Sequence, residues 1–61
     1  MPAAYIDGPK ITDIETKRAL VKEVTDAMEK AYKLPRQAFV VTLTENPPEN
    51  IGVGGKLISD R

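Results

Sequence analysis

One long helical pattern lies between two short apolar segments and leaves little room for anything else in a chain of 61 residues. From about Asp13 to Tyr32, apolar side chains recur at spacings of three and four residues and form one stripe along a helix. A helix of this length between two strands predicts a β-α-β unit, in which a right-handed crossover makes the strands parallel. The stripe consists of Leu20, Val24, Ala27, Met28 and Ala31.

Both ends of the predicted helix carry specific signals. Thr12 and Glu15 have the spacing of a capping box, in which the Thr12 hydroxyl accepts a hydrogen bond from the Glu15 amide. Pro35 disfavours helix at the residue before it and predicts the end of the segment. Three acid-before-base pairs four residues apart predict ion pairs along the helix: Asp13–Lys17, Asp26–Lys30 and Glu29–Lys33.

The flanking segments are the predicted strands. Residues Pro2–Ile6 are apolar and predict a strand that is buried on both faces. Residues Ala38–Glu45 alternate, with Phe39, Val41 and Leu43 on one face. After a rigid turn at Asn46–Asn50, the glycine-rich segment Ile51–Gly55 predicts a small hairpin. We therefore expect an α+β fold, a single domain over residues 1–61.

The small size of the chain predicts self-association. A single core in a chain this short rarely supplies more than about 3–5 kcal/mol of stability without a disulfide, a metal or a partner. The sequence contains no cysteine and no histidine, so neither a disulfide nor a zinc site of the usual kind is available. A two-stranded sheet with one helix also leaves an apolar sheet face and both edges uncovered. We therefore expect an obligate oligomer.

The charge pattern excludes several classes of partner. Nine basic and nine acidic residues give a formal net charge of zero, without long runs of either sign. Nucleic-acid and membrane-surface binding both need a concentrated positive field, so neither is expected. The N-terminal segment lacks the apolar region of a signal peptide, and we expect a cytoplasmic protein.

Most catalytic chemistry lacks its residues here. The glycine-rich segment fails the phosphate-loop pattern, because Asn50 occupies the first glycine position and Leu57 follows Lys56. Serine and cysteine triads of the usual form need a histidine. The helix carboxylates predict a solvated face rather than an acid–base pair. No metal site is expected.

Pro2 is the one unusual reactive group. A small second residue favours removal of Met1, which would leave a secondary amine at the terminus. An ordinary α-amino group titrates at about 7.7–8.0, and desolvation or a neighbouring cation lowers that value. The result is a base that is partly uncharged near neutral pH, where general bases are most efficient. The alternative is that Pro2 merely begins an edge strand, and while Met1 stays attached its nitrogen is an amide without basicity.

The order of these features resembles the 4-oxalocrotonate tautomerase family. The resemblance rests on Pro2, a short strand, a helix of about twenty residues, a strand ending in Thr44-Glu45, a turn and Gly52–Gly55. It implies a β-α-β protomer, a homohexamer built as a trimer of dimers, and no cofactor. It also implies that the Pro2 amine shuttles a proton between carbon and oxygen of a small 2-oxo or 2-hydroxydienoate acid such as 2-hydroxymuconate.

The resemblance implies substrate-binding positions at which this sequence departs from the family. Thr12 and Val40 stand where the best-known members carry arginines, and Ile51 stands where they carry an aromatic residue. A threonine cannot offer the bidentate charged fork that a carboxylate prefers, and a valine cannot donate at all. Lys10 is the candidate compensating cation, or else a solvated loop lysine. Asn50 either donates a hydrogen bond to substrate or shapes the turn.

Two alternatives follow from these departures. Val40 and Ile51 favour a monoacid substrate with an apolar tail over the usual diacid. The missing arginines also favour a non-catalytic or weakly active member that keeps the fold as a structural subunit or small-ligand binder. A dehalogenase-like role with water would need a carboxylate that activates the water, and the sequence offers no compelling one.

Overall fold

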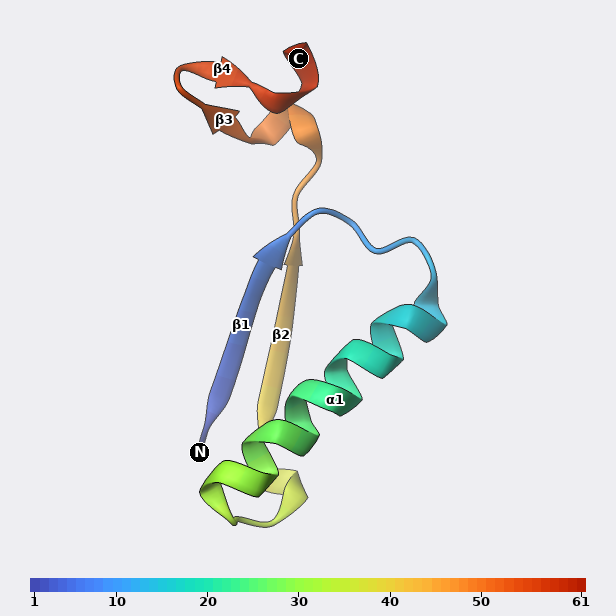
Figure 1. Cartoon of the computed structure of the whole chain (residues 1–61), viewed down its shortest axis with the longest axis vertical. Coiled ribbons are helices and arrows are strands. Elements are labelled where there is room, and N and C mark those ends of the chain that lie inside the picture. The colour runs from blue at the N-terminus through green and yellow to red at the C-terminus, as the bar shows by residue number, and fades with distance from the viewer.

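The computed structural model describes all 61 residues and has the predicted β-α-β order with a C-terminal hairpin (Figure 1). Strands β1 and β2 pair in parallel, with Ala3 opposite Val40 and Gly8 opposite Glu45. The hairpin strands β3 and β4 are antiparallel, and the turn between them uses positive φ angles at Gly54 and Gly55. The elements are β1 (Ala3–Gly8), α1 (Ile14–Tyr32), β2 (Val40–Glu45), β3 (Gly52–Val53) and β4 (Lys56–Leu57).

Helix α1 lies against one face of the two-stranded sheet. Along β1 and β2 alternate side chains are half-buried, and the register places Ile6 beside Leu43 on the face that meets the helix. Leu20, Val24 and Met28 of the predicted stripe are half-buried, as is Val21. The other two stripe residues, Ala27 and Ala31, are exposed. Near its C-terminal end, α1 therefore packs against the sheet with fewer side chains than predicted.

The helix cap differs from the prediction. Asp13, not Thr12, is the N-cap residue, and its carboxylate accepts a hydrogen bond from the Glu15 amide at 3.1 Å. The same carboxylate accepts from the Thr16 hydroxyl at 3.0 Å. An aspartate also carries the negative charge that a helix N-terminus favours, which explains its preference over the neighbouring threonine. Thr12 is therefore left exposed, one residue before the cap.

The predicted ion pairs within the helix are wrong, because groups outside the helix take their partners. Lys17 pairs with Glu45 of β2 at 2.9 Å rather than with Asp13. Arg36, which follows the helix, pairs with both Asp26 and Glu29. The pairs that remain within α1 are Arg18–Glu15 and Lys22–Asp26.

Strand β1 is not buried on both faces within one chain. It alternates between exposed and half-buried residues, and Tyr5 is 80% exposed on the face away from α1. No residue of the chain is fully buried. The reason is that α1 covers only part of one face of the two strands, and nothing in the chain covers the other face.

The chain is elongated rather than spherical. Its principal extents are 44 × 24 × 13 Å, and its radius of gyration is 14.8 Å, against about 10.5 Å for a compact domain of this length. Figure 1 shows the cause: the hairpin and the C-terminus form an arm beyond the end of β2, far from the N-terminus. The arm contributes little to the β-α-β layer.

Candidate active site

Pro2 stands at the head of β1 and is half-buried. Its carbonyl oxygen accepts a hydrogen bond from the Val40 amide at 3.1 Å, which fixes it beside the first residue of β2. The ring nitrogen carries no N–H in the chain, so it takes no part in the strand ladder. Two of the predicted site residues, Pro2 and Val40, are thereby brought together.

The loop that carries Lys10 and Thr12 lies at the opposite end of the strands. Glu45, the last residue of β2, holds this loop: its Oε2 atom accepts from the Ile11 amide at 2.9 Å and pairs with Lys17 Nζ at 2.9 Å. These two contacts, with a weaker electrostatic contribution from Lys10, lower the pKa of the Glu45 carboxyl below its ordinary value. The side chains of Lys10 and Thr12 remain exposed.

Asn50 and Ile51 also lie beyond the carboxyl end of β2, where the hairpin arm begins. Asn50 ends a 3₁₀ turn and is exposed, while Ile51 is half-buried and its carbonyl accepts from the Ile58 amide at 2.8 Å. Ile51 lines a cleft of about 410 Å³ between the end of the sheet and the arm. The rest of the lining is Asp7, Gly8, Pro9, Asn46, Pro48 and Ile58.

The predicted site residues thus form two groups at opposite ends of the sheet. At about 3.3 Å per residue, Pro2 and Gly8 are about 20 Å apart along β1, and the loop and arm lie beyond Gly8. The larger cleft, of about 650 Å³ between α1 and β2, contains none of these residues. A site that uses both groups must therefore combine residues from more than one chain.

Sequence reasoning missed two residues that position these groups. Glu45 fastens the loop of Lys10 and Thr12 to the end of β2, and its position at the end of a strand was the available signal. Arg36 fastens the turn before β2 to α1 through Asp26 and Glu29, at 2.8 and 2.9 Å. The sequence alone does not place the Arg36 side chain, because its contacts depend on the course of the turn.

No group of three or more acidic, cysteine or histidine side chains lies close enough to hold a metal ion. None of the helices has both the length and the apolar character needed to cross a membrane.

The sequence matches the family model described as tautomerase enzyme over residues 2–61. The chain belongs to the tautomerase family. It is 44% identical over 60 residues to a probable tautomerase of Listeria innocua, with 98% of each chain covered. It is 32% identical over 56 residues to the 2-hydroxymuconate tautomerase of Pseudomonas putida, with 92% of this chain and 89% of the relative covered.

Solved structures of tautomerases share the fold. DmpI from Archaeoglobus fulgidus superposes with a TM-score of 0.84 at 41% identity, covering 97% of this chain and all of the other. A protein from Chloroflexus aurantiacus, described as a heterohexamer 4-oxalocrotonate tautomerase, superposes with the same TM-score at 23% identity, over 98% and 97% of the two chains. The β-α-β layer and the hairpin arm are thus the fold of this family.

Proposed function

We propose that this tautomerase interconverts the enol and keto forms of a small 2-oxo acid, with the Pro2 amine as general base and acid. The observation that carries the proposal is the family membership together with Pro2 at the head of β1. The 32% identity to a 2-hydroxymuconate tautomerase supports the substrate class. Removal of Met1 is a requirement, since only a free amine has the lone pair that accepts a proton.

In the proposed reaction, the Pro2 nitrogen takes a proton from the enol hydroxyl and delivers it to carbon, which gives the keto form. In the reverse direction it takes a proton from the carbon and delivers it to the carbonyl oxygen. The amine must be uncharged at the start of the cycle. Partial burial of Pro2 in the single chain, and further burial in an assembly, would lower its pKa because desolvation disfavours the ammonium form. No cofactor takes part.

The site is completed by a neighbouring protomer. Lys10, Thr12, Asn50 and Ile51 of one chain lie too far from its own Pro2, so a second chain supplies them. The absence of any fully buried residue and the 80% exposure of Tyr5 support association. The Chloroflexus relative is a heterohexamer, and the arrangement proposed here is a homohexamer, a trimer of dimers.

Substrate binding rests on Lys10 and on apolar walls. Lys10 is exposed and carries a long side chain that can extend to a carboxylate, whereas Thr12 and Asn50 offer neutral hydrogen bonds. Val40 and Ile51 line the site with aliphatic groups. This lining favours a monoacid with an apolar tail over a diacid, because the second carboxylate would lose its hydration without gaining a charged partner.

The test is the ketonisation of 2-hydroxymuconate and of phenylenolpyruvate by the parent and by Pro2→Ala. We expect kcat/KM to fall by about 10²-fold, within the usual contribution of a general base, because the replacement leaves a less suitable primary amine at the terminus. Ala3→Ser is the matched control, since it changes the exposed neighbour and keeps Pro2. Equal rates in Pro2→Ala and the parent would remove Pro2 from the mechanism.

A non-catalytic role is the second candidate. It is favoured by Thr12 and Val40, which leave two positions of the implied site without a permanent charge. A protein that keeps Met1 and turns over neither substrate would support it.

A further inference from the structure

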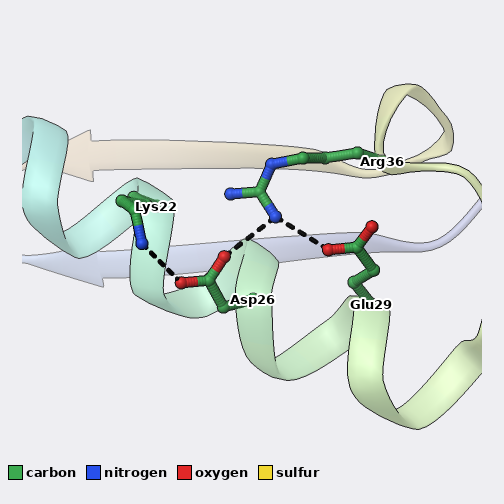
Figure 2. Close-up of polar contacts among 4 residues, drawn as sticks. All are labelled: Lys22, Asp26, Glu29 and Arg36. Atoms are coloured by element: carbon green, nitrogen blue, oxygen red, sulfur yellow. Dashed lines mark hydrogen bonds and ion pairs between the residues drawn. The ribbon is translucent and has the colours of Figure 1, made fainter.

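Arg36 joins the turn before β2 to the C-terminal half of α1 (Figure 2). Its Nη1 atom lies 2.8 Å from Asp26 Oδ1 and 2.9 Å from Glu29 Oε1. Asp26 also accepts from Lys22 Nζ at 2.9 Å. The three helix residues are spaced four and three apart and so lie on one face of α1, toward the turn.

Asp26 and Arg36 of this cluster stay charged near neutral pH. Hydrogen bonds from Lys22 and Arg36 lower the pKa of the Asp26 carboxyl below its ordinary value. The hydrogen bonds that Arg36 donates to Asp26 and Glu29 raise the pKa of the Arg36 guanidinium. Two positive and two negative groups balance, so the cluster holds the turn in place without adding net charge.

A short path of main-chain hydrogen bonds connects Arg36 to Pro2. The Arg36 carbonyl accepts from the Phe39 amide at 3.3 Å, and the next amide, that of Val40, donates to the Pro2 carbonyl at 3.1 Å. The Phe39 ring also lies beside Tyr32, with 6.2 Å between ring centroids. With Met1 attached, Pro2 has no N–H, and its carbonyl bond to the Val40 amide is the ladder contact that fixes its position.

From this geometry we infer that Arg36 is a positioning residue for the Pro2 amine, acting through the turn and the Val40 amide. The inference rests on the proposed function of Pro2. The ion pairs set where β2 begins, and the start of β2 sets where Pro2 lies. Loosening them shifts the reacting nitrogen relative to a substrate that other protomers hold, and such misplacement lowers turnover more than binding.

The test compares Arg36→Gln and Arg36→Lys with the parent, using Lys22→Gln as the matched control. Lys22 pairs with the same Asp26 but does not reach the turn. For Arg36→Gln we expect kcat to fall about tenfold, within the range that small misplacements cost. We expect KM to change by less than about twofold, since the substrate contacts are untouched. Arg36→Lys keeps the charge and should recover part of kcat, and Lys22→Gln should match the parent.

A second readout separates positioning from stability. The acid limb of the kcat/KM pH profile reports the pKa of the Pro2 amine in the free enzyme. We expect the midpoint of this limb to shift in Arg36→Gln but not in Lys22→Gln. Should Arg36→Gln fail to fold, Glu29→Gln removes one of the two contacts and takes its place. An unchanged kcat and acid limb in a folded variant, or an equal loss in Lys22→Gln, would overturn the inference. Pro2→Ala distinguishes the two failures: equal rates in Pro2→Ala and the parent would remove the proposed function and this inference with it. A loss in Pro2→Ala with an unchanged Arg36→Gln would overturn this inference alone.

Discussion

At the scale of single residues, Pro2 and Thr12 carry the largest consequences. Pro2 combines a rigid ring, a half-buried position and the one ladder contact to Val40, which together suit a terminal amine held in one orientation. Thr12 lies outside the helix cap, because Asp13 takes that role. Its hydroxyl is therefore not used by the cap, and in the proposed site this neutral group is the clearest reason to expect a weak response to a diacid.

Arginines at positions 12 and 40 should increase activity on the diacid more than on the monoacid. A hydrogen bond to a charged group is worth about 1.5–3 kcal/mol, which is about 10- to 100-fold in rate if it acts in the transition state. We expect Thr12→Arg to raise kcat/KM for 2-hydroxymuconate by about tenfold and Val40→Arg to raise it further, with little gain for phenylenolpyruvate.

Thr12→Gln is the matched control, because it adds length and hydrogen bonding without charge. Steady-state kinetics with both substrates provide the measurement. Gains that are equal for the two acids, or absent, would argue that residues 12 and 40 do not face the second carboxylate.

At the scale of elements, local patterns predicted type and order, and long-range contacts decided the details. The apolar stripe and Pro35 gave the helix, which ends at Tyr32 as expected, and the alternation after residue 38 gave β2. The predicted cap was wrong because Asp13 caps the helix in place of Thr12. The predicted ion pairs were wrong because Glu45 and Arg36 reach α1 from other elements. Residues from other elements compete with helix residues for the same charged side chains. The outcome depends on the tertiary structure, which the i,i+4 spacing does not predict.

The contacts of Glu45 with Lys17 and with the Ile11 amide depend on pH. Because its pKa in the folded chain lies below the ordinary value of 4.5, its stabilising contribution is complete above that value. It is lost as the pH falls through the lowered, folded-state pKa. We therefore expect the parent to be more stable than Glu45→Gln at neutral pH, and the difference to vanish in acid.

Urea unfolding at fixed protein concentration, from neutral pH into acid, measures this difference. Glu23→Gln, an exposed glutamate of α1, is the control for removing a charge. If the difference in unfolding free energy between the parent and Glu45→Gln does not change with pH, the charge of the Glu45 carboxylate does not stabilise the fold. That result would contradict the prediction.

At the scale of the whole molecule, composition predicted association, and the structure gives its physical basis. The helix covers only part of one face of the two strands, no residue is fully buried, and the arm extends away from the layer. The sequence identified the candidate residues, but it did not predict that they lie at opposite ends of the sheet. The reason is that parallel pairing places strand starts and strand ends at opposite edges, so the proposed site exists only between chains.

The measurement that tests this account most directly is the covalent capture of Pro2 by 3-bromopropiolate, followed by mass spectrometry across pH and protein concentration. The account predicts a single adduct on a chain that has lost Met1. Its rate should rise with pH through a midpoint below the ordinary α-amino value of about 7.7–8.0, and fall on dilution to dissociated chains. Retained Met1, an adduct elsewhere, or a rate that does not depend on assembly would contradict it.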